Sequence, residues 1–376
     1  MIRVWTEKLP RDKREQERRL EELHQATLKN RLKVNVLTLR VGFEIVKLAD
    51  RPDSSLIENI RWIRIAIAEQ YGFAIPKISI EPNPYIDFPP NGYELLLKGV
   101  KICGGKVEVD KFLMINVTGK PIRGIKGIRT KDPVSNSDAL WIDEKDKDEA
   151  ILRGDCVVVN AQAVISTHIG ELIRQYMGEM ITHQDVRDRI NMLQEQFPVI
   201  AEESLNVPLR VIHQVLRDLL HDGIPIKDII TILETIIKVA PEVKYDEIAI
   251  LDYVRSALAM TITDIFKSED GIFKFFTLPA ESESYLVQKV LYDRYNRRLS
   301  ITSDETNKLA KSLNEMAQEA FKMQITPILV VDTIIRYALA KFVERNNIKI
   351  AVLSYSEVST SAKIKHLGNI ELKFES

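Results

Sequence analysis

The sequence has few of the residues on which disulfide frameworks, metal centres and membrane spans depend. Its 376 residues include only two cysteines, Cys103 and Cys156, which lie far apart. No CxxC pair is present, so the sequence offers no zinc ribbon or disulfide framework and fits a reducing cytosol. No apolar run approaches the ~20 residues that a membrane-spanning helix needs. The charged first twenty residues are not expected to be a secretory signal.

The sequence also has no excess of acidic or of basic residues. The 53 basic and 54 acidic residues leave a formal net charge of -1, so no global charge favours nucleic acid or an anionic membrane. The hydrophobic share of 45% and the charged share of 28% are typical of a globular protein. The length suffices for two to four domains.

Motifs of catalysis and metal binding are missing as well. The six histidines are scattered, with no HExxH zinc motif and no GxSxG nucleophile elbow. The acidic run at 143–149 lacks the glycine and the spacing of a calcium loop and indicates a solvated helix start. His168 and Glu171 stand one helical turn apart, which we interpret as a surface or capping contact. The missing motifs therefore give catalysis little support, and we expect no metal and no cofactor.

A basic loop at residues 119–131 supports one alternative of another functional class. Gly119 to Lys126 superficially resembles a phosphate-binding loop, but Ile125 stands where that motif has its lysine and no serine or threonine follows. The loop also carries several basic residues without aromatic partners for base stacking. These are Lys120, Arg123, Lys126, Arg129 and Lys131. A nucleotide-dependent switch using this loop is the alternative.

Residues 208–241 predict two amphipathic helices joined by a short connector. Apolar residues recur at three- and four-residue spacing in both halves. They are Leu209, Ile212, Val215, Leu216 and Leu219, then Ile226, Ile229, Ile230 and Leu233. Gly223 suits a helix end, Pro225 suits the first turn of the second helix, and Pro241 is expected to close the hairpin. A DNA-binding helix-turn-helix is the alternative, but Lys227 and Lys238 are the second helix's only basic residues.

The remaining patterns predict mixed helix and strand. A strand at 34–41, a helix from 56 to 71 and strands at 77–80 and 93–100 indicate an antiparallel α+β unit. Further strands are expected at 113–117 and 138–143, and the strand-then-helix run from Cys156 is expected to rejoin the first unit. Residues 170 to 260 read as almost entirely helical, with one long helix from Asp252 to Phe266. The last third predicts strands and helices in alternation. The strands are 272–278, 327–331 and 350–354, and the helices are 304–323 and 334–346.

Eight stretches, covering about residues 34 to 370 in order, carry a resemblance to a known family. They are VGFEIVKLAD, IENIRWIRIAIAEQYGFAIPKISI, NGYELLLKGVKICGGKV, DP with DALWID, VVVNAQAVISTHIGELI, HQVLRDLLHDGIPIKDIITILETI with its AP, LDYVRSALAMTIT and IAVLSYSEV. Together they resemble the cytoplasmic region of the FlhA/SctV (FHIPEP) export-gate family of flagellar and virulence type III secretion systems. The KGV and AP…YVR features favour the flagellar branch.

The resemblance implies a multidomain α+β fold of four compact subdomains after a charged linker. The first is an antiparallel α+β unit interrupted by a small α/β insertion, the third is all-helical and the fourth is α/β. The expected boundaries are 1–33 for the linker, 34–104 plus 156–172, 105–155, 173–258 and 259–376.

The resemblance also implies a function without catalysis. The family's cytoplasmic regions form a nine-membered ring beneath the export gate, receive chaperone–substrate complexes and order their export. Implied partners are other copies of the chain, the export ATPase complex and further gate components, with no nucleic acid. Members carry an N-terminal membrane domain that these residues do not include, so this chain is either a soluble piece of one or a stand-alone relative. The implied location is the cytoplasmic face of the bacterial inner membrane, and virulence secretion is the alternative to flagellar export.

The family's chaperone-docking site maps onto Asp132, Pro133, Val134, Ser135 and Thr167. The family commonly shows DPAFGL here, whereas this chain has DPVSNS, with Ser135 at the phenylalanine position. Aromatic residues often dominate binding energy, so docking is either weaker, rebuilt with other apolar residues or made to a different partner. The family's linker reaches a neighbouring subunit, which makes Trp5 a candidate for that contact.

Overall fold

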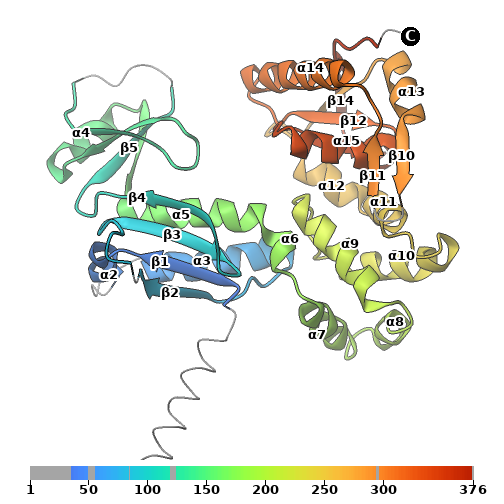
Figure 1. Cartoon of the computed structure of the whole chain (residues 1–376), viewed down its shortest axis with the longest axis horizontal. Coiled ribbons are helices and arrows are strands. Elements are labelled where there is room, and N and C mark those ends of the chain that lie inside the picture. Colours follow the sequence, from blue (N-terminus) through green and yellow to red (C-terminus); the bar gives the residue numbers. More distant parts are fainter. Residues whose placement is uncertain (1–34, 50–55, 84, 119–123, 294–295, 375–376) are drawn as a thin grey trace, which may run out of the picture. The chain divides into compact units, whose positions relative to one another are not determined.

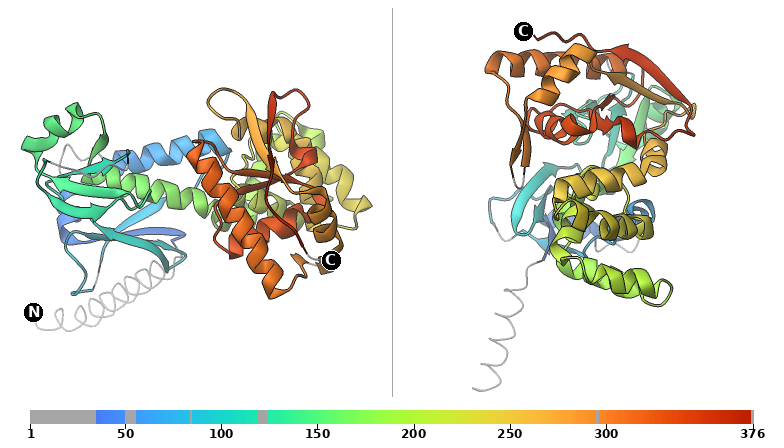
Figure 2. Two further views of the ribbon diagram at one scale, coloured as in Figure 1. Left: turned by 90° about the horizontal axis from the view of Figure 1, so that it is seen from above. Right: turned by 90° about the vertical axis from the view of Figure 1, so that its right-hand side faces the viewer.

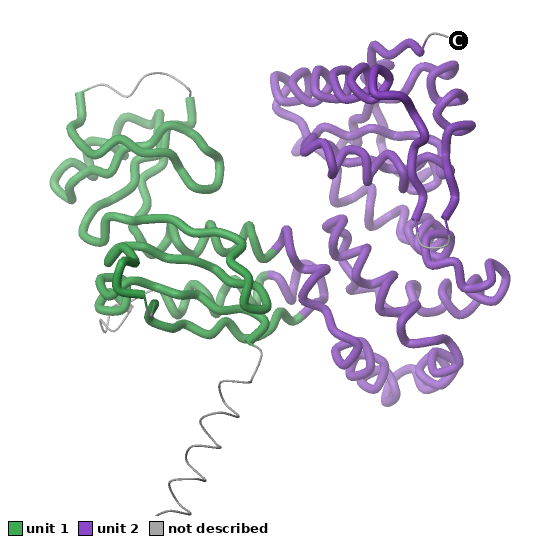
Figure 3. Tube along the Cα trace, viewed as in Figure 1, with its two compact units in different colours: residues 1–66, 74–173 green, residues 67–73, 174–376 purple. Residues whose placement is uncertain are grey.

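The computed structural model describes residues 35–49, 56–83, 85–118, 124–293 and 296–374 (Figure 1, Figure 2). The chain divides into two compact units (Figure 3). The first unit comprises residues 1–66 and 74–173, and the second comprises residues 67–73 and 174–376. Within the described ranges, every helix is too short or too polar to span a bilayer.

The first unit is built on a four-stranded sheet in the order β2-β1-β3-β4. Its elements are β1 (Leu37–Val41), α2 (Phe43–Ala49), α3 (Leu56–Tyr71), β2 (Ile78–Pro82), β3 (Gly92–Leu97), β4 (Val100–Lys106) and α5 (Ala161–Gln175). The pairs β1–β3 and β3–β4 are antiparallel, as expected. The pair β1–β2 is parallel, which corrects the purely antiparallel prediction. The reason is that α3 crosses over between these strands, so the chain enters both from the same end.

The strand expected at 93–100 is a hairpin. Lys98 and Gly99 have φ angles of 50° and 85°, and they separate β3 from β4. A two-residue turn with positive φ at both positions matches the twist of antiparallel strands, and glycine adopts that conformation at little cost. The apolar run therefore contains a reversal that hydrophobic pattern alone did not reveal.

Helices α3 and α5 lie side by side against this sheet (Figure 1, Figure 2). Asn59 of α3 donates to the hydroxyl of Ser166 on α5 over 3.4 Å. Both helices turn an apolar stripe inward, and all six residues of β3 are buried at the centre of the sheet. The stripes include Leu56, Ile60 and Ile67 on α3 and Ile165, Ile169 and Ile173 on α5.

A second antiparallel sheet in the same unit has the order β6-β7-β5-β8. It contains β5 (Phe112–Asn116), β6 (Ile128–Lys131), β7 (Asp138–Ile142) and β8 (Cys156–Asn160), with a 3-10 turn η1 (Glu144–Asp146) and helix α4 (Lys147–Leu152). Cys156–Asn160 was expected to rejoin the first unit's fold, but β8 pairs along its whole length with β5. A short apolar strand does not specify its partner, so only the tertiary fold shows that the return begins with α5.

The second unit opens with a helical array. Its helices are α6 (Met177–Met180), α7 (His183–Leu193), α8 (Pro198–Ser204), α9 (Leu209–His221), α10 (Ile229–Glu242), α11 (Glu247–Ala257) and α12 (Ala259–Ile265). The predicted hairpin is confirmed as α9 and α10, and Gly223 has the left-handed φ of 71° expected after a helix end. The helix expected over 252–266 is two helices, because Leu258 has φ -88° and ψ 14° and leaves the helical conformation.

The connector of this hairpin is longer than predicted. Ile226 donates its N–H to the carbonyl of Tyr71 over 2.8 Å, and Arg189 donates to the carbonyl of Ile226 over 3.0 Å. These contacts hold residues 224–228 outside the helix, so α10 begins at Ile229, where the Asp228 side chain accepts from the N–H of Thr231 (3.1 Å). Pro241 lies inside the last turn of α10 and does not end it.

The rest of the second unit surrounds a parallel sheet in the order β13-β12-β9-β14. This part of the second unit consists of β9 (Phe273–Thr277), α13 (Ala280–Gln288), β10 (Val290–Asp293), β11 (Asn296–Leu299), α14 (Ser303–Lys322), β12 (Ile328–Val331), α15 (Thr333–Arg345), β13 (Ala351–Ser354), η2 (Tyr355–Glu357) and β14 (Ile364–Asn369). The strands β10 and β11 pair with each other in a separate sheet. One face of the sheet packs against apolar residues of α13, α14 and α15. All residues of β12 are buried, as is typical of a central parallel strand. The predicted α+β multidomain class is confirmed, while the boundaries of four subdomains stay a prediction.

Candidate protein-docking site

The predicted docking residues 132–135 lie in the tight turn between β6 and β7. The Asp132 carboxylate, on a residue only 7% exposed, accepts hydrogen bonds from the N–H and the hydroxyl of Ser135, both 2.7 Å long. The Asp132 carbonyl accepts from the N–H of Asn136 (2.9 Å), and its N–H donates to the carbonyl of Ser137 (2.9 Å). Such side-chain-to-backbone bonds are how aspartate fixes a turn. One buried carboxylate therefore determines the shape of this turn.

The turn presents a small, uncharged tip. Pro133, Val134 and Ser135 are exposed, and Val134 shows 40% of its surface. Asn136 adopts a φ of 57°, a left-handed conformation that asparagine tolerates better than most residues. Because Ser135 donates its hydroxyl to Asp132, the exposed apolar surface of the tip comes from Pro133 and Val134.

A polar pair of one buried and one half-buried residue joins β3 to α5 in the same unit. The Tyr93 hydroxyl is 2.8 Å from Nδ1 of His168, and the two rings meet edge to face with centroids 5.9 Å apart. Tyr93 is 2% exposed, and β4 passes directly over its ring at Gly105. A Cβ at Gly105 would lie 2.8 Å from the Tyr93 hydroxyl oxygen, so this position accepts only glycine without rearrangement.

The Asp132 carboxylate of the turn lies near enough to His168 on α5 to affect the pKa of its imidazole. Burial lowers the pKa of His168, and the nearby Asp132 carboxylate raises it in part. Burial also raises the pKa of Tyr93, with smaller contributions from Cys103 and Asp132. The imidazole is therefore neutral and the phenol protonated at pH 7. Thr167 precedes His168 on α5 and is exposed, so Asp132 and the segment that carries Thr167 belong to the same region of the first unit.

The sequence predicted Asp132 and Thr167 but not this polar pair. Tyr93 looked like one residue of an apolar strand, and His168 like a surface contact. The signal was present in Gly104-Gly105, because two glycines in one strand indicate a close approach by another group. Trp5, predicted to contact a neighbouring subunit, lies outside the described residues.

The described part of the basic loop, residues 124–131, runs into a strand rather than a helix. Its last residues, Ile128–Lys131, form strand β6. A phosphate-binding loop instead leads into a helix, whose N-terminal N–H groups hold the phosphate. Gly127 also lies tightly against β7, since a Cβ there would be 2.2 Å from the carbonyl oxygen of Trp141. The described residues 124–131 therefore do not support the nucleotide-switch alternative.

The second unit contains a buried ionic network that the sequence did not predict. Its central members, Arg255 and Arg336, are each 1% exposed. The network contains four short contacts between a guanidinium and a carboxylate. They join Arg255 to Asp222 (2.6 Å), Arg255 to Glu357 (2.6 Å), Arg336 to Asp252 (2.5 Å) and Arg297 to Asp252 (2.9 Å).

This network joins the helical array to the α/β part of the second unit. Asp222 follows α9 and Arg255 lies on α11, while Arg336 lies on α15 and Glu357 in η2. Although burial alone raises the pKa of Asp222, the hydrogen bond with His221 and the guanidiniums of Arg255 and Arg336 lower it to about 2. Removal of one partner from a buried ion pair leaves an uncompensated charge. The paired residues lie 33 to 102 positions apart in the chain, so no local motif indicates them.

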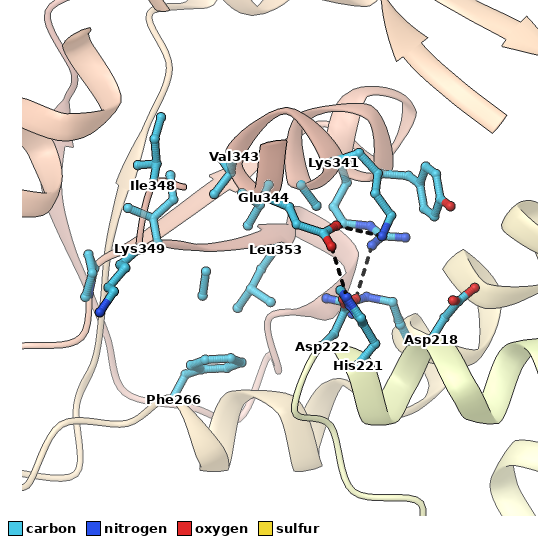
Figure 4. A pocket seen from close by; sticks show the side chains of 18 of the residues that line it. Asp218, His221, Asp222, Phe266, Lys341, Val343, Glu344, Ile348, Lys349 and Leu353 are labelled. Atoms are coloured by element: carbon cyan, nitrogen blue, oxygen red, sulfur yellow. Dashed lines mark hydrogen bonds and ion pairs between the residues drawn. The ribbon is translucent and has the colours of Figure 1, made fainter. Parts of the chain in front are cut away.

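A cavity of ≈ 460 Å³ adjoins the network (Figure 4). It is bordered by the end of α9, by α15 and by residues 348–353, which lead into and include most of β13. Asp218 and His221 project from α9 toward Lys341 and Glu344 of α15, and Phe266 lies at the far end of the space (Figure 4).

Comparison with known proteins agrees with this architecture. Residues 2–363 match the model of the FHIPEP family. Flagellar biosynthesis protein FlhA of Helicobacter pylori strain J99 is 40% identical over 364 residues, which are 96% of this chain and 48% of that protein. FlhA of Bacillus subtilis strain 168 is 30% identical over 344 residues, 91% of this chain and 50% of that protein. The chain thus spans about half the length of these relatives.

Solved structures share the fold at lower sequence identity. The Chlamydia pneumoniae CdsV protein matches with a TM-score of 0.78 and 22% identity, over 90% of this chain and 98% of that one. The nonameric EPEC SctV-C, determined by cryo-electron microscopy, matches with a TM-score of 0.71 and 20% identity, over 90% and 99% of the two chains. CdsV in its complex with CdsO gives a TM-score of 0.77 and 23% identity, over 90% and 98%.

Proposed function

We propose, because the chain belongs to the FHIPEP family, that it is a docking platform of a type III protein export gate. In this proposal it receives chaperone–substrate complexes and orders their export, without catalysing a reaction. The curated relatives are flagellar proteins, one of them 40% identical, which favours flagellar export over virulence secretion.

The observation that carries the proposal is the rigid turn at 132–137. Protein docking needs a preorganised apolar contact, because ordering a loose loop on binding costs entropy. Here Asp132 fixes the backbone through two hydrogen bonds to Ser135, and Pro133 and Val134 remain exposed. Without the family's aromatic residue, Val134 becomes the main apolar contact, and we expect a smaller interface than an aromatic anchor provides.

We also propose that nine copies of the chain assemble into a ring. Two solved relatives are described as nonameric, and both share this fold. In the cell the ring would lie at the cytoplasmic face of the bacterial inner membrane, held there by the part of the protein that the longer relatives include. Its further partners would be the export ATPase complex, a counterpart of CdsO and other gate components.

Two measurements test the proposal. Electron microscopy of the purified chain at high concentration should show nine-fold rings. Export chaperones loaded with substrate should bind the wild-type chain, and Val134→Asp should weaken that binding by about tenfold or more, since a charge would enter the apolar contact. Ser135→Phe should strengthen it. Arg210→Gln, a change at an exposed ion pair in the second unit, is the control. Equal binding by wild type and Val134→Asp would remove the turn from the docking surface.

A further inference from the structure

The cavity beside the buried network runs along the free edge of β13. In the sheet order β13-β12-β9-β14, strand β13 has a neighbour on one side only. Residues 348–353 line the cavity in unbroken succession. Successive side chains of a strand point to opposite faces of a sheet, so a space that meets every residue in turn lies at the edge of the strand. The volume of ≈ 460 Å³ falls within the range of ligand pockets.

The backbone of Val352 points toward this edge. Ala351, the residue before it, donates its N–H to the carbonyl of Pro327, just before β12, over 2.9 Å. Neighbouring residues of a strand direct their backbone N–H and C=O groups to opposite sides, so those of Val352 point away from β12. A sheet edge of this kind is where a further extended chain can add by backbone hydrogen bonds.

Apolar side chains border the same space. Phe266 directly follows α12, Val343 lies on α15, and Ile348 and Leu353 come from the segment that forms the edge (Figure 4). When a peptide adds to a sheet edge, backbone hydrogen bonds provide affinity and pockets for alternate side chains provide specificity. Alternate apolar residues of an added strand would meet these side chains.

Lys349 is the basic side chain of the lining that has no ion pair within the described part of the chain. It is exposed and lies beside Ile348, away from Asp222 and Lys341 (Figure 4). A carboxylate on an added strand could therefore pair with Lys349 without displacing an existing partner, and a cation there would be repelled. The other lysine and arginines of the lining are Lys341, Arg255 and Arg336, which pair with Glu344, Asp222 and Asp252 at 2.8, 2.6 and 2.5 Å.

We propose that the free edge of β13 binds an extended segment of a partner protein, which adds to the sheet as a further strand. The segment forms backbone hydrogen bonds with Val352, places alternate apolar residues against Phe266 and Leu353, and carries an aspartate or glutamate beside Lys349. This site does not include the turn at 132–137 and does not depend on the proposed chaperone docking.

The experiment uses the 376-residue chain with methyl-labelled isoleucine, leucine and valine. The probe is the peptide acetyl-aspartyl-valyl-leucyl-valine amide, compared with two versions N-methylated at the second or at the third residue. The parent peptide should shift the methyl signals of Ile348, Val352 and Leu353 in a saturable way. Because alternate N–H groups of a strand face the same neighbour, one N-methylated peptide should bind on the order of tenfold more weakly and the other about as tightly as the parent.

Lys349→Gln tests the charge. An asparaginyl version of the peptide should bind the wild type about threefold more weakly than the aspartyl parent, since an exposed ion pair contributes modestly. The two peptides should bind Lys349→Gln equally. Lys322→Gln, a change at an exposed lysine of α14 outside the cavity lining, is the matched control and should keep the threefold preference.

Three results would overturn the proposal. They are equal binding by the two N-methylated peptides, no methyl shift in the cavity at millimolar parent peptide, and an unchanged preference for aspartate in Lys349→Gln. Self-association of the chain that the peptide reverses would also overturn it, because a second copy would then occupy the edge. Val134→Asp should bind the peptide as the wild type does, so failure of docking at 132–135 would leave these results unaffected.

Discussion

Arg255 and Glu357 lie 102 residues apart in the chain and form a 2.6 Å ion pair in which each residue is 1% exposed. Burial lowers the pKa of the Arg255 guanidinium, but Glu357 and Asp222 outweigh it and raise that pKa overall. The charge is thus retained inside the protein because two carboxylates compensate it. We infer that the pair chiefly fixes which surfaces of α11 and η2 meet.

Loss of one member of this pair should destabilise the second unit. Arg255→Met leaves Glu357 and Asp222 short of a cation, and we expect a loss of ~3–5 kcal/mol in unfolding free energy. Urea unfolding of the variant measures it. Glu357→Gln in the Arg255→Met background should recover part of the loss, because it removes the orphaned charge.

Arg210→Met is the matched control for that experiment. Arg210 pairs with Glu247 at the surface with a side chain 60% exposed, so its loss should change stability by less than ~1 kcal/mol. Equal losses in the Arg255 and Arg210 variants would show that burial of the network does not matter.

His221 should make stability depend on pH. Its Nδ1 lies 3.3 Å from Asp222 and its Nε2 lies 3.2 Å from Glu344, and a neutral imidazole has only one N–H for these two acceptors. The hydrogen bond to Asp222 raises the pKa of His221, while burial opposes this and Glu344 adds to it. The stabilisation is therefore fully present below the unfolded-state pKa of about 6.5 and is lost as pH rises through the higher folded-state pKa.

His221→Gln tests this sign. The difference in melting temperature between the wild type and the variant should be largest near pH ~6 and should shrink toward pH ~8. The groups around His221 include Asp222, Lys341, Glu344 and, through Asp222, Arg255. A difference that grows as pH rises would contradict the assignment.

The Asp132 carboxylate should hold the docking turn. Asp132→Ala removes the acceptor for both the N–H and the hydroxyl of Ser135, and we expect a loss of ~1–3 kcal/mol in unfolding free energy together with faster amide exchange at residues 134–137. Ser135→Ala keeps the backbone bond and should cost less. Unchanged exchange in Asp132→Ala would mean that the turn does not depend on this side chain.

Gly105 should tolerate no side chain. In Gly105→Ala the new methyl group would overlap the Tyr93 ring, and the backbone above it would have to shift, at a cost of ~1–3 kcal/mol. Tyr93→Phe does not relieve the overlap, because the added Cβ would still lie 2.9 Å from the Tyr93 Cζ position. Thermal unfolding of both variants and of the double variant measures this. Because the two residues are in contact, we expect the stability loss of the double variant to differ from the sum of the losses of the two single variants.

The sequence by itself determined the elements whose cause is local. Apolar spacing predicted α9, α10, α14 and α15, and the glycine at 223 predicted the end of α9, because helix faces and caps depend on residues a few positions apart. The eight family stretches predicted the α+β architecture. They also identified Asp132 and Thr167 as candidate docking residues.

Only the tertiary structure decided which remote groups meet. It paired β8 with β5, placed β2 parallel to β1, and brought Arg255 to Glu357 and Tyr93 to His168. In each case one partner comes from a distant element. The free energy comes from completing a strand pair, compensating a buried charge or satisfying a buried polar group. Neighbouring residues do not encode such a choice, because it exists only after the chain has folded.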